Sequence, residues 1–481
     1  MGKARITLAV CITAVAAAAA AASTTVNTAT VSAAAGSPAG VSATASPSSV
    51  QVTVRPGAIR LPGSPTSGPD TTAECKKADG IACFDPDQLR TAYQLPALYA
   101  KGVTGKGVTI MIVDSFGSPT IRADLATFDQ QFGFPAPPQF TIIAPVGQIP
   151  AFNPNNTDMA GWAGETTLDV EYAHALAPAA NILLVETPVS ETEGVTGFPQ
   201  IVQAEEYALA HYNVGVISQS FSATEETFKN YAQLSPLRAA YQDADSRHVT
   251  VLAASGDAGA TDYQSNEVNY YTQRVTSWPD SDPLVTAVGG TQLQQDGAGY
   301  TSVAWNDTYN RAWTLYANGS TDPTPTASGG GTSEFFARPS YQNGVKSVTG
   351  AYRGVPDIAM SAACDGSVDV YSSYQPAAAG WSLTCGTSEA TPEFAAIVAL
   401  ADQVAGHSLG LINPAIYQLE AEHAPGIVDV TSGNNTVSFG QGTGEKPITV
   451  QGYSAGKGYD LVTGVGTVNA QQFVYELAGK R

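Results

Sequence analysis

Short apolar, β-branched runs alternate along the chain with longer segments in which apolar residues recur at helical spacing. The β-branched runs predict buried strands at 108–113, 182–185, 214–218, 249–253 and 284–288. The helical pattern covers 121–132, 165–176, 201–212 and 231–244. Strands that alternate with helices are typical of a mostly parallel sheet with helices on both faces, so we predict an α/β fold. Ligands of such folds bind beyond the carboxyl ends of the strands, where we look for a site.

A further apolar segment, Phe394 to Leu400, predicts a buried helix, with Pro392 expected in its first turn, where a missing N–H costs nothing. Ser388 then lies where a tight Gly-Thr turn leads into this helix. At that position its hydroxyl is surrounded by free backbone N–H groups, which can stabilise an oxyanion. An ordinary helix-capping serine is the alternative interpretation. A nucleophilic serine also requires a base.

The N-terminal part of the chain differs from the rest. Lys3 and Arg5 precede an apolar, Ala-rich stretch, which predicts a signal peptide at 1–22. Residues 23–70 are rich in Ala, Ser, Thr, Pro and Gly, and we predict a low-complexity, mostly disordered leader there. Residues 71–481 are expected to form the folded domain. No later stretch is apolar enough to span a bilayer, so we expect a secreted protein without a membrane anchor in its mature form.

The charge balance limits the possible partners, and the cysteines agree with export. The 481 residues include 22 Lys and Arg against 42 Asp and Glu, a formal net charge of −20. This charge argues against nucleic acid and anionic membranes as partners and suits a protein that works in acid. Of five cysteines, Cys11 falls in the predicted signal peptide; the other four are most simply paired as neighbours in sequence, although three connectivities and a zinc site are alternatives: Cys75 with Cys83, and Cys364 with Cys385.

Acidic residues supply the candidates for a base. Glu165 and Asp169 are four residues apart on a predicted helix, so their carboxyl groups are neighbours, and 165–178 contains no Lys or Arg. Two adjacent acids can raise one pKa and give a general base suited to acidic pH; a solvated acidic face is the alternative. Asp257 follows the predicted strand 249–253 in a Gly-rich turn and is either functional or a simple turn carboxylate.

These motifs, in this order, resemble those of the sedolisin family of serine-carboxyl peptidases: Glu-x-x-x-Asp at Glu165 and Asp169, Ser-Gly-Asp ending at Asp257, and Gly-Thr-Ser-x-x-x-Pro at Ser388. Smaller markers at 86–93, 288–291 and 356–358 extend the resemblance from about Phe84 to the C-terminus. It implies a subtilisin-like fold in which acids replace the usual catalytic histidine. It further implies that Ser388 is the nucleophile, Glu165 its base, Asp169 the residue behind the base, and a protonated Asp257 an oxyanion donor.

The resemblance also implies one Ca²⁺ ion bound by a C-terminal loop region. The matching residues are two carboxylates and three backbone carbonyls, a set of oxygen ligands that suits a hard cation: Asp429, Val430, Gly456, Gly458 and Asp460.

The chain departs from the family in three places. Cys385 stands where the family usually has Ser, which we attribute to a bridge with Cys364. Ser220-Phe221-Ser222 replaces a Ser-Trp-Gly-like substrate-binding strand, and a low-complexity leader stands where a folded pro-domain is usual.

Taken together, the sequence predicts a monomeric, secreted serine-type endopeptidase that acts on protein or peptide substrates at acidic pH. Two alternatives are kept. A Ser/His/Asp hydrolase would use Asp114 and a His-Gly-Thr turn, but none of the five histidines is followed by Gly-Thr. A catalytically weak or inactive peptidase-fold binding protein is the other.

Overall fold

The computed structural model describes residues 59–61, 68–297, 299–313, 323–440 and 446–480. The predicted signal peptide, Cys11 and most of the predicted leader lie outside the described residues. None of the helices in the described part of the chain has the length and apolarity needed to cross a bilayer.

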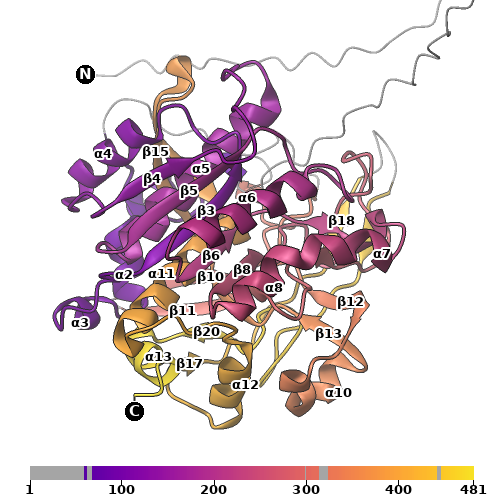
Figure 1. Cartoon of the computed structure of the whole chain (residues 1–481). Coiled ribbons are helices and arrows are strands. Elements are labelled where there is room, and N and C mark those ends of the chain that lie inside the picture. The colour runs from indigo at the N-terminus through magenta and orange to yellow at the C-terminus, as the bar shows by residue number, and fades with distance from the viewer. Residues whose placement is uncertain (1–58, 62–67, 298, 314–322, 441–445, 481) are drawn as a thin grey trace, which may run out of the picture. The chain divides into compact units, whose positions relative to one another are not determined.

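An eight-stranded sheet forms the centre of the described chain (Figure 1). Its strands run in the order β11-β10-β8-β6-β3-β5-β4, with β14 also paired to β10, and all neighbouring pairs are parallel except β10 with β11. This confirms the predicted mostly parallel sheet. The strands are β3 (Thr109–Ser115), β4 (Phe140–Ile143), β5 (Asn181–Thr187), β6 (Val216–Gln219), β8 (Thr250–Ala254), β10 (Thr286–Asp296), β11 (Gly299–Ala304) and β14 (Ile358–Ser361).

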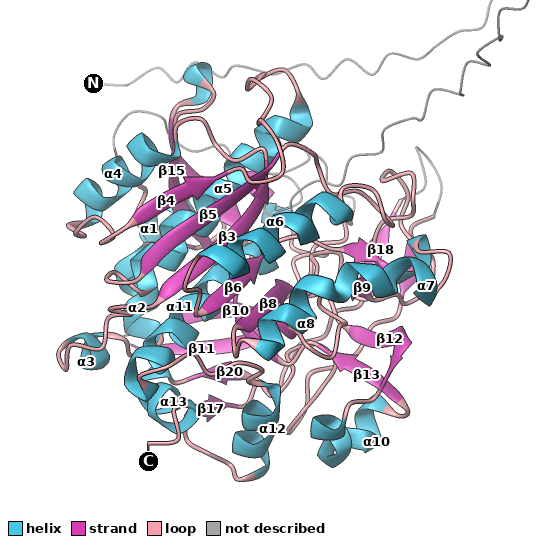
Figure 2. Cartoon of the chain, viewed as in Figure 1, coloured by secondary structure: helices cyan, strands magenta, loops and turns pink. Residues whose placement is uncertain are grey.

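Helices cover both faces of this sheet, as Figure 2 shows. Ile110 and Ile112 of β3 contribute to one hydrophobic core, whereas Met111 and Val113 contribute to the other, because successive side chains of a strand point to opposite faces. Residues of α5 and α11 supply the first core, and residues of α6 and α8 the second. The longer helices are α4 (Ile121–Phe132), α5 (Thr157–Leu176), α6 (Phe198–His211), α8 (Ala239–Ser246), α11 (Thr387–Ala405), α12 (Asn413–Ala421) and α13 (Ala470–Leu477).

A four-stranded sheet with the order β1-β16-β15-β2 leads the chain to Ser388. Its strands are β1 (Ile59–Leu61), β2 (Cys83–Phe84), β15 (Ser367–Ser372) and β16 (Gly380–Cys385). β1, which falls in the predicted leader, pairs antiparallel with Leu383 to Cys385 of β16. Both predicted disulfides are present, Cys75–Cys83 and Cys364–Cys385. The second fixes the last residue of β16 to the segment that follows β14.

The remaining elements are short. They comprise α1 (Thr72–Ala78), α2 (Pro86–Ala92), α3 (Pro96–Tyr99), α7 (Tyr231–Leu234), α10 (Lys346–Thr349), and the strands β7 (Ala223–Thr224), β9 (Ser277–Trp278), β12 (Gly331–Ala337), β13 (Tyr352–Val355), β17 (Ile427–Val428), β18 (Val437–Phe439), β19 (Ile448–Val450) and β20 (Thr467–Val468).

Three local predictions are wrong. The helix expected at 231–244 is interrupted by a 3₁₀ turn, Ser235–Arg238, because Pro236 has no N–H to donate. The polar, Gly-rich segment before Ser388, for which no strand was predicted, is the regular strand β16. Pro392 is not in the first turn of its helix, since α11 begins at Thr387 and the proline is its sixth residue.

Candidate active site

Ser388 is the second residue of α11, immediately after the strand β16 and the turn at Gly386. Gly386 has φ 128°, a conformation that side-chain-bearing residues rarely adopt, so glycine is needed between the strand and the helix. Ser388 is fully buried, and its Oγ has no hydrogen-bond partner among the described residues. The N-terminal turn of α11 therefore presents an unbonded hydroxyl beside the backbone N–H of Ser388, while the N–H groups of Thr387, Glu389 and Ala390 already bond to Asp257 and Gly386.

Pro392 frees the backbone carbonyl of Ser388, because residue 392 would normally donate its N–H to the residue four positions earlier. The hydroxyl of Ser220, just beyond β6, lies 3.5 Å from this carbonyl oxygen. The same hydroxyl donates to Oδ1 of Asp169 at 3.0 Å. Ser220 thus joins the backbone of the candidate nucleophile to one of the two predicted acids.

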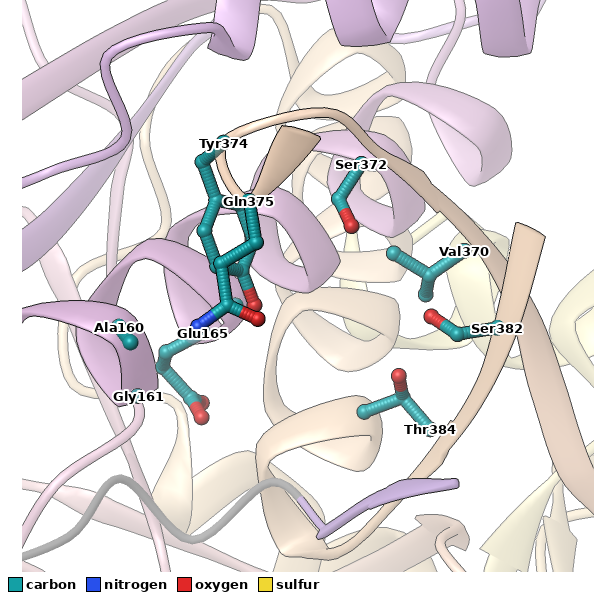
Figure 3. Close-up of a pocket in the computed structure, with 10 residues that line it drawn as sticks. Ala160, Gly161, Glu165, Val370, Ser372, Tyr374, Gln375, Ser382 and Thr384 are labelled. Atoms are coloured by element: carbon teal, nitrogen blue, oxygen red, sulfur yellow. The ribbon is translucent and has the colours of Figure 1, made fainter. Parts of the chain in front are cut away.

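Glu165 and Asp169 are both fully buried on α5, which packs against α11 and the sheet. Glu165 lines a cavity of about 210 Å³ between α5 and the β15–β16 hairpin. Figure 3 shows Glu165 on one side of this cavity and Ser382 and Thr384 of β16 on the other. Because Thr384 lies only four residues before Ser388, the cavity adjoins the segment that carries the nucleophile.

Asp114 is a third acid at this place, contributed by the carboxyl end of β3. Burial raises the pKa of Asp114 to about 7. Burial, together with the charges of Asp114 and Glu165, raises the pKa of Asp169 well above its ordinary value. No ion pair among the described residues brings Lys or Arg to any of the three. With no cation beside them, Asp114 and Asp169 keep their protons to a higher pH than exposed carboxyl groups do, because burial raises the pKa of each.

Asp257 follows β8 and lies against the first residue of α11. Its Oδ1 accepts hydrogen bonds from the backbone N–H of Thr387 at 2.7 Å and from the Thr387 hydroxyl at 2.8 Å. Its Oδ2 is shielded from water and has no hydrogen-bond partner in the described chain. Burial raises the pKa of Asp257 to about 7, although the bonds from Thr387 act in the opposite direction. Below this pH the carboxyl carries a proton that Oδ2 can donate.

The structure brings the four predicted residues to one region: Asp257 bonds to Thr387, the residue before Ser388, and Ser220 connects Asp169, a neighbour of Glu165, to Ser388. The sequence did not indicate the parts played by Asp114, Ser220 and Thr387. Asp114 entered only as a member of the histidine alternative, although its place at the end of a buried strand was a usable signal.

No histidine takes part in this arrangement within the described residues. His174 is buried in α5, where its Nε2 lies 2.9 Å from the carbonyl oxygen of Pro135 and 3.2 Å from Oδ1 of Asp129. It is a packed helix residue.

Four of the five predicted calcium residues come together: Asp429, Gly456, Gly458 and Asp460. Asp429 accepts a hydrogen bond from the N–H of Gly458 at 3.0 Å, and Asp460 accepts one from the N–H of Gly456 at 2.9 Å. Oδ1 of Asp460 further accepts the N–H groups of Val462 and Thr463. Oδ1 of Asp460 thus already accepts two N–H groups, whereas Oδ2 of Asp460 and the carboxylate of Asp429 keep lone pairs for a cation. Two carboxylates beside one Gly-rich turn fit a Ca²⁺ ion.

Comparison with known proteins agrees with this architecture. The sequence model of the subtilase family matches residues 149–444. Kumamolisin of Bacillus sp. (strain MN-32) is 30% identical over 393 residues, which is 80% of this chain and 62% of that protein. Human tripeptidyl-peptidase 1 is 29% identical over 72% of this chain and 56% of its own length, and sedolisin of Pseudomonas sp. (strain 101) is 28% identical over 78% of this chain and 59% of its own length.

The structure of Pseudomonas sedolisin, described as a serine-carboxyl proteinase complexed with two molecules of pseudo-iodotyrostatin, matches with a TM-score of 0.64. The match has 24% sequence identity and covers 83% of this chain and 99% of that one, so it supports the subtilisin-like fold. The chain belongs to the subtilase family, and within it to the sedolisin-type serine-carboxyl peptidases. It spans about three fifths of the length of these curated relatives.

Proposed function

We propose that this protein is a serine-type endopeptidase that hydrolyses peptide bonds at acidic pH. The observation that carries the proposal is the carboxyl group of Asp257, held through Oδ1 by Thr387 with Oδ2 unbonded beside the start of α11. A carboxyl group that keeps its proton up to about pH 7 can act there as a hydrogen-bond donor to a developing oxyanion.

In the proposed mechanism, Oγ of Ser388 attacks the carbonyl carbon of the peptide bond while the Glu165 carboxylate takes the hydroxyl proton. Asp169, which accepts a hydrogen bond from Ser220, keeps the carboxyl group of Glu165 in position. The protonated Asp257 and the backbone N–H of Ser388 donate hydrogen bonds to the oxyanion. Glu165 then returns the proton to the leaving amine, and water releases the acyl group by the same steps in reverse order.

The proposal also includes secretion, a monomeric state and protein or peptide substrates. An acidic protein with a predicted signal peptide and two disulfides fits a secreted monomer that acts on protein or peptide substrates. The alternative is a catalytically weak or inactive binding protein, because Ser220-Phe221-Ser222 departs from the family's substrate strand. Internally quenched peptides separate the two: turnover supports the peptidase, whereas binding without turnover supports the alternative.

The pH profile tests the mechanism. Asp257 is active when protonated, so activity should fall as pH rises through about 7, the value to which burial raises its pKa. Activity should also fall at low pH, as the Glu165–Asp169 pair that receives the Ser388 proton becomes fully protonated. We expect a bell on the acid side of neutral when kcat/KM is measured from pH 2 to 9.

The Asp257→Asn variant is the control for the alkaline limb. Its amide donates a hydrogen bond at any pH, so the fall near pH 7 should weaken or vanish. A wild-type profile that instead rises through about pH 6.5 to a neutral or alkaline optimum would indicate a histidine base and reject the mechanism.

Calcium is the second part of the proposal. Asp429 and Asp460 would hold the ion with the carbonyl groups of Val430, Gly456 and Gly458, and the ion would stabilise the fold by binding only the native state. Chelation should therefore lower the melting temperature, by the equivalent of about 3 kcal/mol for an ion present at a hundred times its dissociation constant. Thermal unfolding with and without EDTA measures this.

The Asp460→Ala variant should melt at a lower temperature than the wild type and should no longer respond to EDTA. Asp296→Ala, at the end of β10, is a matched control that should respond like the wild type. The site is absent if the chelator leaves the wild-type melting temperature unchanged and elemental analysis finds no bound calcium.

A further inference from the structure

Four acidic side chains form a second group at the carboxyl edge of the sheet, away from Glu165: Glu191, Glu193, Glu226 and Asp262, here called the acidic cluster. Glu191 and Glu193 lie in the segment between β5 and α6, Glu226 follows β7, and Asp262 lies five residues beyond Asp257. The members act on one another through their charges. Beyond burial, the charges of Glu193 and Asp262 raise the pKa of Glu191, and that of Asp262 also raises those of Glu193 and Glu226.

Hydrogen bonds hold two of these carboxyl groups side by side. Thr224 of β7 and Ser277 of β9 are directly opposite each other across the strand pair. The N–H of Thr224 donates to Oε2 of Glu193 at 2.9 Å, and the hydroxyl of Ser277 donates to Oδ2 of Asp262 at 3.0 Å. The pair of strands therefore fixes both acids rather than leaving them free to separate.

Glu191 is the third carboxyl group here, and among the neighbouring charges that of Glu193 acts on it most strongly. Glu191 is fully buried, and neither of its carboxyl oxygens has a hydrogen-bond partner among the described residues. The backbone of Gly197 packs closely against that of Glu191: an added Cβ on Gly197, which has φ 87°, would lie 2.8 Å from the Glu191 Cα. A buried polar side chain that forms no hydrogen bond costs free energy, so its position calls for a partner that binds from outside.

No ion pair among the described residues involves a member of the acidic cluster, although Arg274 lines the same small cavity as Glu226. In the described chain no Lys or Arg charge acts on Glu191, Glu193 or Asp262. The negative charge of these carboxyl groups is complementary to a basic side chain, whose N–H groups can bond to them directly. Glu193, Glu226 and Asp262 are only partly buried, so the cluster reaches the surface.

The cluster is close to the candidate catalytic residues. An added Cβ on Gly256 would lie 3.5 Å from Oδ2 of Asp262, and the N–H of Gly256 donates to the hydroxyl of Thr387 at 3.2 Å. Gly256 therefore lies between Asp262 and Thr387, and Thr387 in turn bonds to Asp257 and precedes Ser388. A peptide lying across Ser388 can extend a side chain toward it.

We propose that the acidic cluster binds a basic side chain, Arg or Lys, of the peptide substrate and so directs cleavage to peptides that carry one. This inference rests on the proposed peptidase function. A guanidinium group is planar and has five N–H donors, so it can pair with more than one of these carboxylates. As the cation binds, it stabilises the ionised carboxylates, which then release their protons.

Three sets of internally quenched peptides test the inference, identical except that one position at a time carries Arg, the neutral isostere citrulline, or Glu. We expect kcat/KM for Arg to exceed that for citrulline by at least about tenfold at one position, and Glu there to be disfavoured. Glu191→Gln and Glu193→Gln, which keep the shape of the side chain, should each bring the Arg-to-citrulline ratio toward one. Glu205→Gln is the matched control, a buried glutamate of α6 bonded to Gln219, and should keep the ratio.

Binding separates this inference from the proposed function. In the Ser388→Ala background, the best Arg peptide should bind at least about tenfold more tightly than its citrulline counterpart by calorimetry, even if the wild type cleaves neither. The inference is overturned if neither kcat/KM nor affinity distinguishes Arg from citrulline at any position, or if Glu191→Gln and Glu193→Gln both keep the preference.

Discussion

Replacement of Ser388 by alanine is expected to lower kcat for peptide hydrolysis by about a thousandfold or more while the fold is kept. The nucleophile is the one group that forms the covalent bond to the substrate, and its loss in serine hydrolases has effects of this size or larger. Alanine is a good helix former, and the Ser388 hydroxyl makes no hydrogen bond among the described residues, so little stability depends on it.

Ser408→Ala is the matched control. This serine lies next to Gly215, at the amino end of β6 and so at the opposite edge of the sheet from Asp257. Its loss should leave kcat unchanged. Thermal unfolding of both variants checks the fold. Substantial turnover by Ser388→Ala, with a normal melting temperature, would reject the assignment of the nucleophile.

The second large effect concerns stability, which we expect to be highest in acid and to fall toward neutral pH. Burial raises the pKa of Glu205 and of Asp402 to about 8, and it raises those of Glu389 and Glu393 well above their ordinary values. In the unfolded chain the same groups release their protons near pH 4. Stability is therefore fully present below about pH 4 and is lost as pH rises toward 8, by about 1.4 kcal/mol per pH unit for each buried acid.

Between pH 4 and pH 8 the melting temperature should fall by about 10 °C or more. Glu205→Gln keeps an acceptor for Gln219 but cannot ionise, so this variant should melt like the wild type at pH 4 and above it at pH 8. Glu206→Gln, the adjacent and less buried residue, should follow the wild type at both values. A wild-type melting temperature that increases from pH 4 to pH 8 would contradict the argument.

Local pattern was sufficient where one element is shaped by its own residues. The helix at Ile121–Phe132 was predicted to the residue, because its apolar spacing ends at Gly133, which adopts the left-handed conformation that terminates helices. The buried strand that ends near Asp114 was also found, since its β-branched run has no other good solution.

Local pattern failed where distant segments decide. α5 begins at Thr157, eight residues before the predicted start, although Gly161 and Gly164 disfavour a helix there. The side chain of Asn156 caps this helix. Trp162 is fully buried in the hydrophobic core that also contains residues of α6 and α8, so tertiary packing outweighs helix propensity. The strand β16 was missed for a similar reason, because it is defined by pairing with β15.

The candidate site shows the same division. The four catalytic candidates could be found because each belongs to a short motif, whereas their connections could not. Asp114 approaches Asp169 only when β3 and α5 pack together, and Ser220 reaches the Ser388 carbonyl only because Pro392 has left it unbonded. No spacing in the sequence encodes these contacts.

The Cys364–Cys385 disulfide has a consequence for survival among proteases. The two cysteines enclose the β15–β16 hairpin, whose connecting loop exposes residues 376–378 to solvent. A cut in that loop by any protease divides the chain in two between the cysteines. The disulfide keeps the two fragments covalently joined at the last residue of β16, three positions from Ser388. A nicked molecule therefore retains both halves of its candidate catalytic centre until a reductant separates them.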